Sequence, residues 1–193
     1  MSTSILSSPF KSVGTLSALA LQKGIKNLEE CMQYLKKIPY GRNSARDDFS
    51  LVFKEGCGTC SSKHAVLKSI AIEQEIESVQ MVLCIYKMTE KNTPNIGEHI
   101  SKAGLDYIPE AHCYLQIGTT KHDLTSPNAN METIADEILY EEQILPHQVD
   151  EYKVASHKTF LKSWLHEEKI NLSFNELWTL REKCIESLSK NKV

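Results

Sequence analysis

Residues 56–73 read GCGTCSSKHAVLKSIAIE and are the most informative stretch for the fold. From Ala65 to Ala71 the apolar residues gather near one side of a helical pattern, so we expect a helix directly after the glycine-rich loop. Thr59 or Ser61 can cap its N-terminus. Cys60 is then expected in the first helical turn.

Cys60 is the candidate nucleophile. A thiol attacks only as the thiolate, and a helix N-terminus or a nearby imidazolium lowers its pKa. Unpaired backbone N–H groups in the first turn can also stabilise an oxyanion. Gly56 and Gly58 allow the chain and a substrate carbonyl to approach closely. The cysteines outside this loop stand in apolar or helical contexts, where a cysteine is usually a small buried hydrophobe: Cys31, Cys84, Cys113 and Cys184.

A thiol nucleophile needs a base, and His112 is the candidate. The segments HCYLQI (112–117) and KHDLTS (121–126) predict two short strands joined by a turn at Gly118–Thr120. Pairing across this turn places Asp123 near Gln116 or Thr119, within reach of His112 if the strands twist. The Asp123 carboxylate would then fix the imidazole tautomer and favour its charged form.

Three blocks of this sequence resemble the signature blocks of the transglutaminase-like superfamily: GCGTCSSKHAVL around Cys60, AHCYLQI with His112, and KHDLTSP with Asp123. The resemblance covers about residues 40–127. It implies a papain-like core in which a helix carrying the nucleophile packs on a small antiparallel sheet carrying the histidine and aspartate. It also implies a thioester formed with an acyl or amide substrate, whose acyl group then passes to water or an amine.

The expected function is therefore that of a thiol acyl enzyme: a peptidase, an amidase or deamidase, or a transglutaminase-like transferase. Its substrate would be a peptide, a protein or a small amide, and the chemistry needs no metal or organic cofactor. Two alternatives stay open. One is an acyltransferase of the arylamine acetyltransferase kind, and the other is a non-catalytic binding or scaffold protein that keeps the fold.

The sequence departs from the family in two places. Ser61-Ser62-Lys63 follow the nucleophile, where many members carry Arg-Asp, and many also have an aromatic residue beside or shortly before it. Cys113-Tyr114 follow the histidine in place of the usual tryptophan. These differences leave the substrate class open.

Other interpretations of the same residues are possible. Cys57 and Cys60 form a C-x-x-C, but redox pairs of this kind follow a strand in a βαβ context that is not seen here. A zinc site at Cys57, Cys60 and His64 would need a fourth ligand, such as His112, and no second C-x-x-C exists. His64 lies four residues after Cys60 on the same helix face and competes with His112 as base.

Asn43, in the loop YGRNS, could donate its amide to the oxyanion, although such a residue is more often part of a turn. Arg42 and Arg46 could bind an anionic substrate group or form a solvated face. Trp164 and Trp178 recur at helical spacing with leucines and are expected in the core or facing a partner.

The remaining chain predicts helices, then strands, then helices, which favours an α+β fold. Helical patterns run from Leu16 to Ile38, with a break at Gly24, and a buried strand is expected at 79–88. Residues 40–56 read as a polar loop, residues 89–110 as a long connection with a short helix, and residues 127–146 as irregular. Two helices end the chain, around 152–167 and 173–189, with Ser173 and Glu176 as a capping box.

The 193 residues suit a single domain, with N-terminal helices in 1–39, the catalytic core in about 40–127 and C-terminal helices in 149–193. The net charge of −3 gives no electrostatic case for a nucleic-acid or membrane partner. The segment Leu16–Leu21 is too short to span a bilayer, and no signal peptide is expected, so a cytoplasmic location with free thiols is the expectation.

Overall fold

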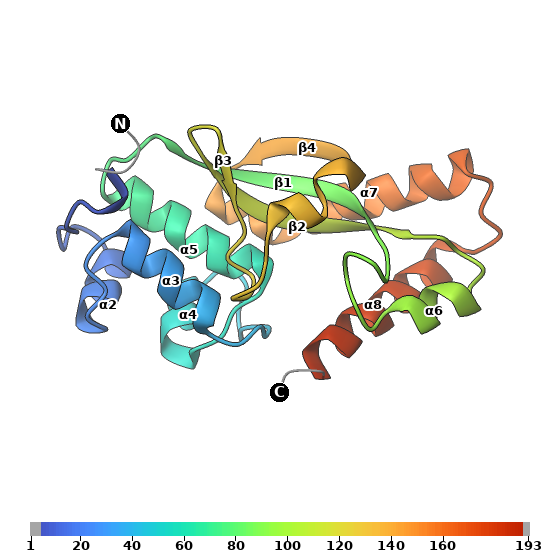
Figure 1. Cartoon of the computed structure of the whole chain (residues 1–193), viewed down its shortest axis with the longest axis horizontal. Helices are drawn as coiled ribbons and strands as arrows, with labels where there is room; N and C mark the ends of the chain where they lie inside the picture. Colours follow the sequence, from blue (N-terminus) through green and yellow to red (C-terminus); the bar gives the residue numbers. More distant parts are fainter. Residues whose placement is uncertain (1–4, 191–193) are drawn as a thin grey trace.

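The computed structural model describes residues 5–190. It has an α+β fold with a four-stranded antiparallel sheet in the order β3-β2-β1-β4. The strands are β1 (Val79–Met88), β2 (Ile108–Ile117), β3 (Thr120–His122) and β4 (Ile138–Ile144). Figure 1 shows helices gathered at both ends of this sheet.

The α-helices of the described part, in chain order, are α2 (Thr15–Gln22), α3 (Leu28–Lys37), α4 (Ser50–Glu55), α5 (Cys60–Glu73), α6 (Gly97–Lys102), α7 (Glu151–Glu167) and α8 (Phe174–Lys190). Three 3₁₀ turns, η1 (Met131–Thr133), η2 (Ala135–Glu137) and η3 (Pro146–Val149), flank β4. The sequence predicted the α+β class, the break at Gly24, the bounds of β1, and the Ser173–Glu176 cap, whose side chains bond at 2.7 Å. None of these helices is both long enough and apolar enough to cross a bilayer.

Two hydrophobic clusters lie on the two faces of the sheet. Along β1, Met81, Leu83 and Ile85 join the helices α2 to α5, whereas Val82, Cys84, Tyr86 and Met88 join α6, α7 and α8. Successive strand side chains point to opposite faces, so one strand serves both clusters. The sheet therefore holds the two groups of helices together.

Three sequence expectations are corrected. α4 lies inside the expected polar loop, where the Asp48 carboxylate accepts from the Ser50 backbone N–H at 2.9 Å and so satisfies a donor that the helix itself leaves unpaired. β4 lies inside the expected irregular stretch and pairs antiparallel with β1. β2 begins at Ile108, so His112 stands inside the strand and does not open it.

The β2–β3 register is also corrected. Leu115 pairs with His122 and Ile117 with Thr120, so Asp123, which follows β3, continues the register to a point opposite Tyr114 rather than Gln116 or Thr119. Asp123 is thus two residues from the level of His112. Pairing with β3 stops at Leu115, which leaves the β2 edge beside His112 open to the N-terminus of α5.

Candidate active site

Cys60 is the first residue of α5. Thr59 caps the helix: its hydroxyl accepts from the Ser62 N–H at 3.3 Å, and its own N–H donates to the Ser62 hydroxyl at 3.0 Å. A side chain at Gly58 would place its Cβ 2.9 Å from the Lys63 stem, so the chain needs glycine there. The capped turn holds the thiol at a fixed place beside β2.

His112 and Asp123 meet as a hydrogen-bonded pair. The His112 Nε2 lies 2.9 Å from Asp123 Oδ2, and Oδ1 accepts from the Thr125 N–H at 2.8 Å. Only 13% of the His112 side chain and 9% of the Asp123 side chain are exposed. With Nε2 bound to the carboxylate, Nδ1 is the ring nitrogen left for another partner, and Cys60 is among the groups that raise the pKa of His112.

The charged forms of Cys60, His112 and Asp123 stabilise one another. Burial raises the pKa of the Cys60 thiol, but Lys153 and His112 outweigh it and lower that pKa to about 6. Burial lowers the pKa of His112, but the negative charges of Asp123 and Cys60 have a larger, opposite effect. The pKa of His112 therefore lies well above its usual value. The pKa of Asp123 falls despite burial, because His112 is beside it. A thiolate–imidazolium pair at neutral pH follows.

His64 is fully buried and is not available as a base. Its Nδ1 donates to the Cys60 carbonyl, and its Nε2 accepts from the Leu124 N–H at 2.8 Å. Both nitrogens are therefore committed in the neutral ring, and burial, the largest effect, lowers the pKa of His64 to about 4. His64 ties the first turn of α5 to the chain segment that carries Asp123.

A buried lysine contacts the candidate nucleophile, Cys60. Lys153 Nζ, on α7, lies 3.6 Å from Cys60 Sγ and donates to the Ser61 hydroxyl at 2.8 Å. Burial lowers the pKa of Lys153, but Cys113, Cys60 and Glu110 outweigh it and raise the pKa above the usual value. Lys153 and His112 are thus the two cations that lower the pKa of Cys60.

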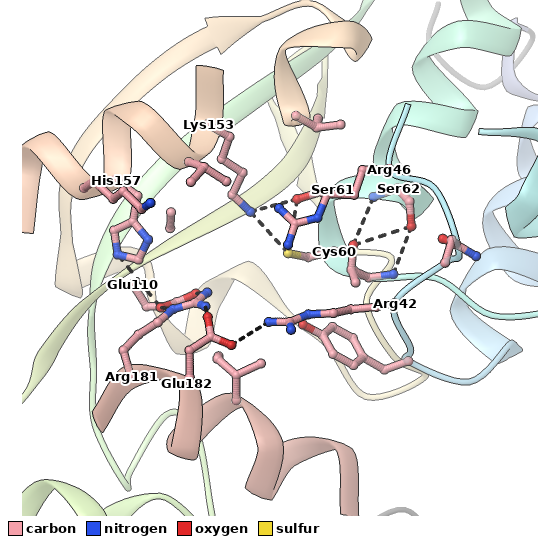
Figure 2. Close-up of a pocket in the computed structure, with 18 of the residues that line it drawn as sticks. Arg42, Arg46, Cys60, Ser61, Ser62, Glu110, Lys153, His157, Arg181 and Glu182 are labelled. Carbon is pink, nitrogen blue, oxygen red and sulfur yellow. Dashed lines mark hydrogen bonds and ion pairs between the residues drawn. The ribbon is translucent and has the colours of Figure 1, made fainter. Parts of the chain in front are cut away.

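A cavity of about 320 Å³ leads to Cys60 and Lys153 (Figure 2). Across from them, Glu110 binds Arg181 through both carboxylate oxygens, and Arg181 and Arg42 both bind Glu182. Of the His112–Asp123–Cys60 group, Cys60 alone lines the cavity. A substrate in this cavity would reach the thiol from the side of α7.

Asn43 lines the same cavity, but its amide is engaged elsewhere. Nδ2 donates to Glu55 at 2.9 Å and to the Cys57 carbonyl at 3.0 Å. This leaves no amide hydrogen for a substrate, so these bonds argue against the expected oxyanion role of Asn43. Arg42 is bound to Glu182, and Arg46 lines the cavity.

The other sequence candidates lie as follows. All six cysteines are free thiols, and Cys57 is half-buried. Within residues 5–190, no group of three or more His, Cys, Asp or Glu side chains is arranged to hold a metal ion. Trp164 is buried in the second hydrophobic cluster, and Trp178 lines the cavity with its ring stacked on Phe174.

Sequence reasoning missed Lys153, Glu110, Arg181 and His157. The sequence held a signal for two of them. Lys153 and His157 stand at helical spacing with Leu161 and Trp164, on the buried face of α7. Polar residues at positions where a buried helix face normally has apolar residues can mark a functional site. For Glu110 and Arg181 no comparable pattern exists, because their contact joins residues 71 positions apart.

Comparison of this chain with protein-family models, with curated proteins and with solved structures gave no match.

Proposed function

We propose that this protein is a thiol acyl enzyme of the papain-like, transglutaminase-like kind, with Cys60 as nucleophile, His112 as acid and base, and Asp123 as the residue that orients His112. The observation that carries the proposal is the Asp123–His112 hydrogen bond of 2.9 Å next to a thiol at a capped helix N-terminus. A peptide, a protein or a small amide would be the substrate.

In the proposed reaction the Cys60 thiolate attacks the carbonyl carbon, and the carbonyl π electrons move to oxygen. When the carbonyl re-forms, the bond to the leaving group breaks and His112 donates its proton to that group. A thioester remains on Cys60. Neutral His112 then takes a proton from water or an amine, which attacks the thioester and returns the thiolate.

An activated ester tests this proposal. The protein is mixed with 4-nitrophenyl acetate, nitrophenolate release is followed by stopped flow, and the acetylated residue is located by mass spectrometry. We expect a burst of one equivalent with the acetyl group on Cys60. Cys60→Ala should abolish the burst, and Cys57→Ala, three residues away in the same loop, should keep it.

The same experiment separates the two fates of the thioester. An added primary amine that shortens the lifetime of acetyl-Cys60 and leaves as its acetamide indicates a transferase, whereas an unchanged lifetime indicates a hydrolase. A protein that acquires no acetyl group at Cys60 would argue for the non-catalytic alternative.

A further inference from the structure

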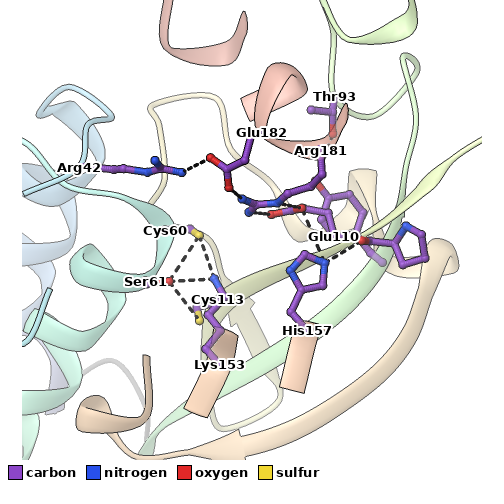
Figure 3. A network of polar contacts seen from close by, with 12 residues as sticks. Arg42, Cys60, Ser61, Thr93, Glu110, Cys113, Lys153, His157, Arg181 and Glu182 are labelled. Atoms are coloured by element: carbon purple, nitrogen blue, oxygen red, sulfur yellow. Dashed lines mark hydrogen bonds and ion pairs between the residues drawn. The ribbon is translucent and has the colours of Figure 1, made fainter. Parts of the chain in front are cut away.

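The position of Lys153 has a consequence beyond the triad. We infer that Lys153 is a further catalytic residue of this site, whose ammonium group donates a hydrogen bond to the oxyanion that forms when Cys60 attacks a carbonyl. This inference rests on the proposed function. Figure 3 shows the compact group that Lys153 forms with Cys60, Ser61 and Cys113, apart from the Glu110–Arg181–Glu182 chain of ion pairs.

The donor geometry of Lys153 suits this role. An ammonium group has three N–H donors. One is given to the Ser61 hydroxyl at 2.8 Å and one to the Cys60 sulfur at 3.6 Å. Lys153 also lines the cavity through which a substrate carbonyl would arrive. After the attack, the carbonyl oxygen is joined to the sulfur through one carbon atom. It is therefore within reach of Lys153, which already contacts the sulfur.

The ion pairs around the cavity leave Lys153 without a carboxylate in direct contact. Glu110 is a buried acid that lines the same cavity, and both of its oxygens bind Arg181. Within residues 5–190, no carboxylate lies within 4.0 Å of Lys153 Nζ, and the lysine is only 9% exposed. A buried cation without a counter-ion is costly. The thiolate is the anion that Lys153 contacts at rest, and the oxyanion would take its place once the sulfur becomes neutral.

The electron balance shows what Lys153 does in each step. As the C–S bond forms, negative charge leaves the sulfur and appears on the carbonyl oxygen. Lys153 keeps its proton throughout and shifts its hydrogen bond from the sulfur to this oxygen. When the carbonyl re-forms, the charge passes to the leaving group, which takes its proton from His112. The Cys60 backbone N–H, in the first turn of α5, is the second donor for the same oxygen.

Two reagents separate this role from simple activation of the thiol. Iodoacetamide alkylates a thiolate without forming an oxyanion, whereas 4-nitrophenyl acetate acylates it through one. Both rate constants are measured from pH 5 to pH 10 for wild type, Lys153→Met and Lys162→Met. Lys162 is a matched control, because it lies on the same helix but is exposed and stacks over Phe174.

The pH series is needed because several groups face Lys153 or Cys60. They are Cys113, His112 and Glu110 from β2, Tyr40 from the loop after α3, and Cys60 itself from α5. Removal of Lys153 therefore moves the pH at which Cys60 ionises. The two reactions are compared on the alkaline plateau, where the thiol is ionised in every variant.

On that plateau we expect Lys153→Met to lower the acylation rate constant by about 100- to 1000-fold, the usual effect of removing an oxyanion donor, while alkylation is nearly unchanged. Lys162→Met should match wild type in both reactions. Equal losses in both reactions, or no loss of acylation, would overturn the inference. A wild type that is not acylated at Cys60 would instead contradict the proposed function.

Ser61→Ala is the second variant and decides the question if Lys153→Met does not fold. It removes the acceptor that orients Lys153 but keeps the cation, so acylation should fall while plateau alkylation stays. If Ser61→Ala is acylated at the wild-type rate, the position of the Lys153 ammonium group does not matter for stabilising the oxyanion, and the inference is wrong.

Discussion

At the scale of single residues, the site depends on which protons the side chains hold. In the proposed reaction His112 gives its Nε2–H to Asp123, so that Nδ1 can exchange a proton with the substrate and Cys60. The Asp123 carboxylate enforces this, because both of its oxygens only accept hydrogen bonds, one from His112 and one from the Thr125 N–H.

Asp123→Asn should therefore inactivate the protein without unfolding it. The asparagine oxygen would keep the bond from the Thr125 N–H, so its NH₂ group would face His112 Nε2 and force the neutral ring into the tautomer protonated on Nδ1. We expect acylation of Cys60 by 4-nitrophenyl acetate to fall by at least about 100-fold, in line with the large loss in triads whose tautomer is wrong.

The control for this variant is Asp136→Asn, in the 3₁₀ turn η2 and exposed. It makes the same chemical change away from the site and should acylate like wild type. If Asp123→Asn acylates as fast as this control, His112 does not need an orienting carboxylate and the triad is wrong.

At the scale of elements, α5 is fixed to the rest of the site by His64. Its buried neutral ring bonds the Cys60 carbonyl and the Leu124 N–H, which joins the helix start to the segment after β3. The folded pKa of about 4 is below the ordinary value near 6.5, so the unfolded chain binds the proton more readily. The contribution of His64 to stability is thus present above pH 6.5 and lost as the pH falls toward 4.

We predict that His64→Gln reduces the acid sensitivity of folding. Wild type should lose about 3 kcal/mol of unfolding free energy through this group between pH 7 and pH 4, whereas glutamine does not titrate. Urea unfolding at both pH values gives the difference. His147→Gln, at an exposed histidine, should keep the wild-type pH dependence. An equal pH dependence in His64→Gln would show that His64 is not held neutral.

The elements also show what the sequence could predict. α5, β1, α7 and α8 are long, so the apolar spacing of the helices and the β-branched and aromatic residues of β1 were sufficient to predict them. β4 was missed because it is an edge strand in which Ile144 alone is buried, so its alternation is weak. α4 was missed because it has only six residues, too few for a helical pattern to show in the sequence.

For the site, the glycine-rich loop, the helix start and the hairpin were visible in the sequence as local patterns. The position of Asp123 opposite Tyr114 was not, because it depends on a register that the turn length alone did not give. Lys153 meets Cys60 across 93 residues of chain, and packing of α7 on β2 creates that contact. Periodicity reports which face of an element is buried, and it does not report what that face meets.

At the scale of the whole molecule, the cavity lies where the two groups of helices meet. α5 brings Cys60 from one side of the sheet, and α8 brings Arg181 from the other, where it binds Glu110 of β2 (Figures 2 and 3). Glu110 is only 5% exposed, and burial alone would raise its pKa, but Arg181 and His157 keep it ionised. This ion pair therefore connects α8 to the sheet.

Arg181→Met should be strongly destabilising, because it leaves the Glu110 carboxylate buried without its main partner. A loss of about 3–5 kcal/mol in unfolding free energy is expected, measured by urea denaturation at pH 7. The double variant Glu110→Met/Arg181→Met removes both charges and should be more stable than Arg181→Met. If the double variant is instead the less stable of the two, the ion pair does not account for the attachment of α8.

The central claim is that Cys60 is the activated thiol of this protein, and competitive alkylation tests it most directly. Wild-type protein is treated with less than one equivalent of iodoacetamide from pH 5 to pH 9, and labelling of each cysteine is measured by mass spectrometry. Cys60, although only 8% exposed, should be labelled before the more exposed Cys57, with a half-maximal rate near pH 6. Faster labelling of Cys57 across this range, or a Cys60 midpoint near the ordinary thiol pKa of about 8.5, would contradict it.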